Sequence, residues 1–145
     1  MIKYLNCLVS LLNRIRTGGK KDAGPGVNKR AELGREGESI AENFLKQNRY
    51  KILEKNFRTK FGELDIIAKD KKCVVFVEVK TRKDDSFGAP QSAVTGFKQE
   101  NLALAAMVYI KKKVLRSDYR FDIIAIQDGK IEHIKNAFAP SGFTV

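Results

Sequence analysis

Two strand-forming runs joined by a very short turn constrain the fold of this chain more than any other feature. Residues 62–69 and 73–81 both have the pattern of strands, the second with the stronger β-propensity, and only Asp70, Lys71 and Lys72 separate them. Runs of this kind at this spacing predict an antiparallel hairpin. Because side chains alternate between the two faces of a strand, the turn also fixes which residues share a face.

Pairing outward from a tip at Lys71 and Lys72 places Asp65 opposite Glu78 and Glu63 opposite Lys80. Opposed side chains on one face have Cβ atoms roughly 5 Å apart. Two facing carboxylates repel each other unless a cation lies between them, and Asp and Glu oxygens are the ligands that Mg²⁺ prefers. The pattern predicts a carboxylate site with one ammonium beside it. The alternative is an edge strand whose solvated face carries a weak ion pair.

The charge of the chain indicates a polyanionic partner. Among 145 residues, 28 are Lys or Arg and 17 are Asp or Glu, which gives a net charge of +11. Residues 1–30 contain seven of the basic residues and only one acid, Asp22. An excess of this size favours nucleic acid or an anionic membrane surface as the partner.

The N-terminal part differs from the rest of the chain. Residues 1–16 have apolar side chains at three- and four-residue spacing, which predicts a short amphipathic segment that docks on its own domain, on a partner or on a membrane surface. This segment is too short to span a bilayer, so no stable membrane insertion is expected. Residues 17–28, which contain four glycines and a proline, are expected to be a flexible linker, and residues 29–145 one domain.

The remaining periodicity predicts an α/β domain in the order α-β-β-β-α-β-β. The expected elements are a helix at 29–48, strands at 50–57, 62–69 and 73–81, a helix at 89–115 with Pro90 in its first turn, and strands at 120–126 and 130–134. Cys7 and Cys73 are far apart and His133 is the only histidine, so His133 is interpreted as structural. Any metal would be held by carboxylates, which favours magnesium, manganese or calcium.

An ordered set of motifs resembles the YraN-like family of small bacterial proteins, which is related to archaeal Holliday-junction resolvases. The motifs are Gly34-Arg35-Glu36-Gly37-Glu38, Asn56-Phe57-Arg58, Gly62-Glu63-Leu64-Asp65, Phe76-Val77-Glu78-Val79-Lys80, Phe87-Gly88-Ala89-Pro90, Lys98 and Arg120-Phe121-Asp122. They include the Asp…Glu-x-Lys pattern of restriction-endonuclease-like nucleases. The resemblance implies a restriction-endonuclease-like fold, with a mixed central β-sheet flanked by helices.

The resemblance also implies roles for individual residues. Asp65 and Glu78 would be ligands of Mg²⁺ or Mn²⁺, Lys80 would position the attacking water, and Glu38 would be a further catalytic acid and ligand. Glu63 would support these ligands without contacting the metal itself. Leu64 stands where many relatives have proline before the aspartate.

Several basic residues are candidate contacts to DNA. Arg58, Lys60, Arg82 and Lys83 are expected in loops near the carboxylates. Lys98 occupies a helix position where some relatives have glutamine, and a phosphate contact is one role open to it.

These observations lead to the expectation of a cytoplasmic, metal-dependent endonuclease that cleaves branched or otherwise structured DNA. A homodimer would suit symmetric cutting of a junction. Two alternatives remain, a non-catalytic nucleic-acid-binding module of the same fold and a membrane-associated adaptor that uses residues 1–16.

Overall fold

The structure is a computed structural model that describes residues 27–82, 94–113 and 116–140, and the statements below concern these residues. The predicted element order is confirmed. The elements are α2 (Val27–Gln47), β1 (Lys51–Thr59), β2 (Gly62–Asp70), β3 (Cys73–Arg82), α3 (Gly96–Lys113), β4 (Asp118–Gln127) and β5 (Lys130–Phe138). The predicted amphipathic segment 1–16 and most of the predicted linker lie outside the described residues.

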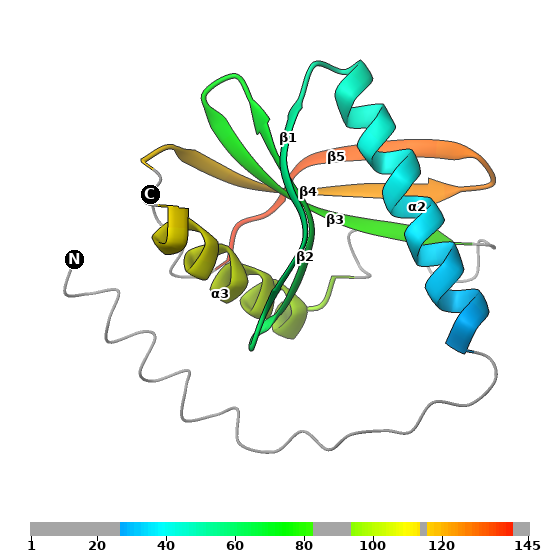
Figure 1. The fold of residues 1–145 in the computed structure, drawn as a ribbon, viewed down its shortest axis with the longest axis horizontal. Helices are drawn as coiled ribbons and strands as arrows, with labels where there is room; N and C mark the ends of the chain where they lie inside the picture. Colours follow the sequence, from blue (N-terminus) through cyan, green and yellow to red (C-terminus); the bar gives the residue numbers. More distant parts are fainter. Residues whose placement is uncertain (1–26, 83–93, 114–115, 141–145) are drawn as a thin grey trace.

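The five strands form one mixed sheet in the order β1-β2-β3-β4-β5 (Figure 1). Neighbouring strands are antiparallel except β3 and β4, which are parallel over their whole length. Parallel neighbours need a crossover connection, and α3 lies in the segment that connects β3 to β4. The strand β3 is therefore central, and the alternative of an edge strand with a solvated face is wrong.

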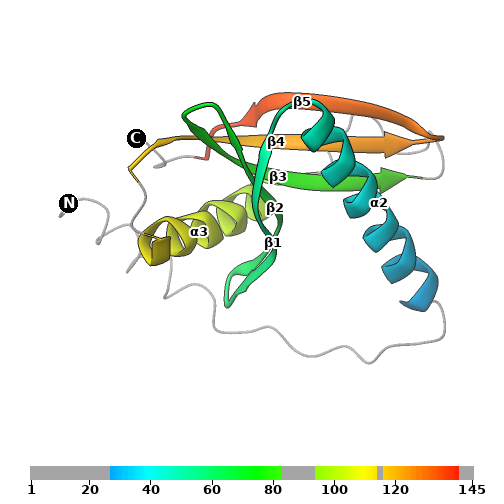
Figure 2. The same cartoon turned by 45° about the horizontal axis from the view of Figure 1, so that its top comes forward.

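A helix covers each face of the sheet, so alternate residues of β3 enter two different cores (Figure 2). Val75 and Val77 pack with Ala41 and Leu45 of α2 in one core. Phe76 packs on the other face, in the core that contains α3. Glu78 follows Phe76 by two residues, and alternation along the strand directs it to the α3 face.

The helix α3 begins later than the sequence pattern predicts. Val94 and Thr95 are not helical, and Gly96 is the first helical residue, so one continuous helix over 89–115 is wrong. Pro90, the predicted start, lies outside the described residues. Thr95 caps the helix, because its Oγ1 accepts a hydrogen bond from the Lys98 N–H at 3.4 Å. A threonine cap satisfies a free N–H at the helix start, which agrees with a helix that begins directly after Thr95.

No helix among the described residues is long and apolar enough to cross a membrane.

Candidate functional site

The strands β2 and β3 separate at the predicted carboxylates. The observed register pairs Asp70 with Cys73 and continues to Ile66 opposite Val77, which confirms the predicted turn at Lys71 and Lys72. Beyond Ile66 the paired ladder with β3 ends, whereas β2 stays paired with β1 as far as Gly62. We call the place where β2 leaves β3 the fork, and Asp65 and Glu78 are the first residues on its two sides.

Asp65 is held at the fork by the backbone of β3. Its Oδ2 accepts a hydrogen bond from the Val79 N–H at 2.8 Å, which replaces the interrupted ladder with a side-chain contact. Burial, followed by repulsion from the Glu78 carboxylate, raises the pKa of Asp65 to about 7 against the lowering effect of this hydrogen bond. The two carboxylates are therefore close enough to influence each other, as the pairing predicted.

Glu78 is buried, and its two oxygens have different surroundings. Oε1 lies 2.7 Å from Lys80 Nζ and 3.3 Å from Lys98 Nζ, so two ammonium groups share one oxygen. Oε2 is buried and has no hydrogen-bond partner among the described residues. A buried carboxylate oxygen without a partner is costly. It is an available ligand for a cation that enters the fork.

Lys98 is brought to the site by the tertiary structure. It lies in the first turn of α3, where the helix dipole disfavours a cation. The contact with Glu78 Oε1 offsets this effect, and the Thr95 cap fixes the start of the helix that carries Lys98. The side chain of Lys98 therefore contacts a predicted metal ligand, and its contact with a phosphate stays a prediction.

Glu38 approaches the fork from α2. The preceding residue, Gly37, packs so closely on β3 that an added Cβ would overlap Thr81 Oγ1 and lie 3.3 Å from Thr81 Cβ. Glu38 is half-buried, and its pKa is raised by burial and by the negative charge of Glu63. The charge of Glu38 also raises the pKa of Asp65, although it is the weakest of the influences there.

The donor set fits a hard divalent cation held by two carboxylates. Within the described ranges, no group of three His, Cys, Asp or Glu side chains is arranged to hold a metal ion, so Glu38 does not complete a preformed three-carboxylate group. Mg²⁺ commonly binds through one or two carboxylates together with water and substrate phosphate. Asp65 and Glu78 can supply such a pair, and the partnerless Oε2 of Glu78 is the feature that favours it.

The other predicted residues on β1 and β2 lie near the hairpin that joins these strands. Glu63 is opposite Arg58 in the register and forms an ion pair with it at 3.2 Å. The predicted pairing of Glu63 with Lys80 is therefore wrong, because β2 has already left β3 at this point. Lys60 lies at the turn, with its Nζ 5.0 Å from the centre of the Phe61 ring.

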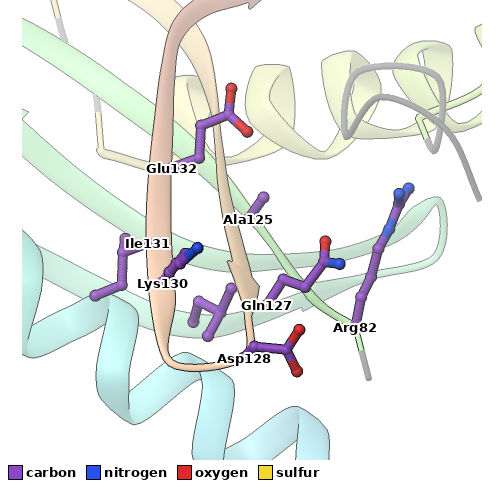
Figure 3. A pocket seen from close by; sticks show the side chains of 8 residues that line it. Arg82, Ala125, Gln127, Asp128, Lys130, Ile131 and Glu132 are labelled. Atoms are coloured by element: carbon purple, nitrogen blue, oxygen red, sulfur yellow. The ribbon is translucent and has the colours of Figure 1, made fainter. Parts of the chain in front are cut away.

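The prediction of a loop is wrong for two of the basic residues. Arg58 lies in β1, and Arg82 is the last residue of β3. Arg82 is opposite Gln127 in the register and lines a cavity of about 380 Å³ with the β4–β5 turn, where Asp128 and Lys130 lie (Figure 3). Arg82 is four positions after Glu78 along the strand, or about 13 Å. Lys83 lies outside the described residues.

A second polar cluster, on β4 and β5, was not predicted as a site. Asp122 is fully buried and accepts hydrogen bonds from Arg120 Nε at 3.0 Å and from the Asn136 N–H at 2.9 Å, and its Oδ2 lies 2.8 Å from His133 Nε2. Arg120 also contacts Asp70 at 3.0 Å and donates to the Tyr50 hydroxyl at 2.7 Å. The signal in the sequence was a lone aspartate within an apolar strand, since a buried carboxylate requires partners.

Burial alone would raise the pKa of Asp122, but hydrogen bonds from His133, Arg120 and Asn136 outweigh it and lower the pKa. Asp122 is therefore held as a carboxylate. The cluster joins β2, β4 and β5 to the start of β1, and its interpretation as structural agrees with the expectation for His133.

Comparison with known sequences places the chain in a family. The sequence model of the Uncharacterised protein family UPF0102 matches residues 37–126, which is more than half of the chain. The chain belongs to the UPF0102 family. This is the YraN-like family that the motifs indicated. The match extends from Gly37 to Ile126 in β4 and includes Glu38, Asp65, Glu78, Lys80 and Lys98.

Individual UPF0102 proteins are similar over most of their length. A UPF0102 protein of Thermodesulfovibrio yellowstonii is 55% identical over 111 residues, which cover 75% of this chain and 97% of that protein. One from Geotalea daltonii is 51% identical, over 79% of this chain and 95% of its own length. One from Geobacter sulfurreducens is 46% identical, over 79% of this chain and 94% of its own.

Proposed function

We propose that this UPF0102 protein is a metal-dependent endonuclease that hydrolyses phosphodiester bonds in branched or otherwise structured DNA. The observation that carries the proposal is the fork, where Asp65 and Glu78 lie side by side and the buried Glu78 Oε2 has no partner among the described residues. Two adjacent carboxylates beside ammonium groups are suited to holding a cation against a phosphate. The net charge of +11 supports a polyanionic substrate.

The residues at the fork divide the work as follows. Asp65 and Glu78 would hold Mg²⁺ or Mn²⁺, which supplies a Lewis acid for the phosphate and lowers the pKa of the attacking water. Lys80 would position that water. Lys98 would face the negative charge that develops on the phosphoryl oxygens. The partly buried position of the fork limits competing hydration of these charges.

Two features of the fork affect cation binding, namely the proton that Asp65 holds near neutral pH and the two ammonium groups that contact Glu78. Asp65 has a pKa of about 7, so near neutral pH it must release a proton before both carboxylates are charged. Lys80 and Lys98 both contact Oε1 of Glu78 and leave Oε2 open. A cation that reaches Oε2 would therefore leave both ammonium contacts on Oε1 in place, but because Oε2 is buried, side chains at the fork must move to admit it.

The test is cleavage of a panel of labelled DNA structures. Four-way junctions, flaps, single strands and continuous duplex are incubated with Mg²⁺, Mn²⁺ or chelator. We expect cleavage of structured DNA with metal and none with chelator. Asp65→Asn and Glu78→Gln should each lower the cleavage rate by at least about 100-fold, beyond the 10–100-fold typical of changes to outer-shell residues.

Asp128→Asn is the matched control, because Asp128 is exposed in the β4–β5 turn, far along the sheet from the fork. It should cleave like the parent. DNA binding by Asp65→Asn and Glu78→Gln should persist, because phosphate contacts come from basic residues elsewhere. Parental cleavage by both fork variants would refute the assignment of the site.

A non-catalytic nucleic-acid-binding module of the same fold is the second candidate. It is favoured by the observation that two ammonium groups already contact Glu78, which neutralises much of the charge that would attract a cation. In this case DNA binding would be unchanged by chelator, and neither metal would support cleavage of any substrate in the panel.

A further inference from the structure

A basic cavity lies at the opposite end of β3 from Arg82. It has a volume of about 510 Å³ and is lined by Lys69, Lys72, Arg116, Ser117 and Asp118. These residues come from the end of β2, the β2–β3 turn and the start of β4. Figure 1 shows that this turn and the start of β4 lie at the same side of the sheet, away from the β4–β5 turn.

The cavity has an excess of positive charge that the nearby acids do not remove. Three of the lining side chains are basic and one, Asp118, is a carboxylate, and all four of these residues are exposed. Asp70 is the other acid at the turn, but its Oδ2 is bound to Arg120 at 3.0 Å. Lys71, also exposed, adds a further positive charge at the turn.

The arrangement of the cavity is fixed by the fold. The Ser117 hydroxyl donates a hydrogen bond to the Lys72 carbonyl at 2.6 Å, which joins the β2–β3 turn to the segment before β4. Cys73 and Asp118 then begin the parallel pairing of β3 and β4. Cations that are brought together in this way repel each other unless an anion is present, and a phosphate group is the anion that three Lys and Arg side chains suit.

We propose that this cavity is a second phosphate-binding site, which holds the backbone of duplex DNA at a place distinct from the fork. Lys72 and Glu78 are six residues apart along an extended segment, or about 20 Å. One phosphate cannot contact two places that are about 20 Å apart. Phosphates of one strand follow each other about every 3.4 Å along the helix axis, so this separation corresponds to about six of them. The cavity and the fork therefore contact different phosphates of one nucleic acid.

This proposal goes beyond the proposed nuclease function, because it concerns binding and not catalysis. The test measures the affinity of the metal-free protein for a 20-base-pair duplex between 50 and 200 mM salt, with chelator present. The variant carries Lys69→Gln, Lys72→Gln and Arg116→Gln together. Each phosphate contact contributes about 0.9 to the slope of log affinity against log salt, so three lost contacts should reduce the slope by about 2.7. Over this fourfold range of salt, the parent should lose about 40-fold more affinity than the variant.

The matched control carries Lys46→Gln, Arg49→Gln and Lys130→Gln, which removes the same charge from exposed positions that do not line the cavity and do not pair with a residue that lines it. Its slope should stay close to that of the parent. Lys69→Arg, Lys72→Arg and Arg116→Lys together should retain the parental slope, since the charge at the cavity is kept. Thermal unfolding of each variant verifies that it is folded.

Three results would overturn the proposal: an unchanged slope in the cavity variant, an equal change in the control variant, or loss of binding to phosphatidylserine vesicles without loss of binding to DNA. Failure of the nuclease function gives a different result. In that case no DNA would be cleaved with Mn²⁺, while the cavity variant would still lose the salt-dependent part of its affinity.

Discussion

Gly37 offers the sharpest test of how the structure places α2 on the sheet. An alanine Cβ at this position would overlap Thr81 Oγ1 and lie 3.3 Å from Thr81 Cβ and 3.7 Å from its Cγ2. Gly34 lies one turn earlier on the same helix, and an added Cβ there meets nothing within 4 Å. The two glycines therefore form a matched pair for one substitution.

The expected magnitudes follow from two opposing effects. Replacing glycine by alanine inside a helix stabilises it by about 1 kcal/mol, and Gly34→Ala should show most of this gain. Gly37→Ala has the same gain but forces atoms into a packed contact, which costs about 1–3 kcal/mol. The free energy of unfolding of Gly37→Ala should therefore be about 1–3 kcal/mol below that of Gly34→Ala.

Equilibrium urea unfolding, monitored by circular dichroism, measures both free energies under the same conditions. Thr81→Ala removes Oγ1 and Cγ2, so the double variant Gly37→Ala with Thr81→Ala should recover part of the loss. The coupling in this double-mutant cycle should be about 0.5–3 kcal/mol in favour of the double variant. Equal stability of Gly37→Ala and Gly34→Ala would refute the close contact, and with it the placement of Glu38.

Two further predictions follow from the buried carboxylates. Asp65 has a pKa of about 7 in the folded, metal-free protein against an ordinary value of 3.8, so the folded state holds an extra proton between these values. With chelator present, the free energy of unfolding should therefore fall as the pH rises from 5 to 8. Asp65→Asn should lack this part of the decrease. Parallel pH profiles of the parent and Asp65→Asn would contradict the raised pKa. Asp122 has a lowered pKa, so the stability it contributes is present above its unfolded pKa of about 3.9 and is lost as the pH falls through the lower folded value. Asp122→Asn should lower the free energy of unfolding at pH 7, measured by urea unfolding, by about 3–5 kcal/mol. The control Asp128→Asn lies in an exposed turn and should change it by less than about 0.5 kcal/mol. Equal effects of the two substitutions would mean that the Asp122 cluster does not stabilise the fold.

Local patterns in the sequence were sufficient to predict the order of the helices and strands and the register between β2 and β3. The turn at Lys71 and Lys72 fixes the β2–β3 pairing, because a hairpin this short leaves few alternatives. Asp65 and Glu78 could be placed together for the same reason. The start of α3 could not be predicted as well, because Pro90 and Thr95 are both acceptable helix starts and the sequence pattern does not rank them.

Contacts between distant segments were decided only by the tertiary structure. Lys98 reaches Glu78 because α3 crosses the face of the sheet that carries the fork, and no spacing in the sequence reports where a crossover helix will lie. Glu63 pairs with Arg58 instead of Lys80, because β2 leaves β3 after Ile66 and an ideal hairpin register contains no such separation. For β3 the sequence by itself determined which side chains share a face, because Val75 and Val77 enter one core and Phe76 the other, as alternation predicts. For β2 it did not, because Leu64 and Ile66 are two residues apart and yet lie in different cores. Packing decided which of these side chains lie beside an ammonium group, a glycine of α2 or a cavity, because these neighbours depend on how two helices fit against a twisted sheet.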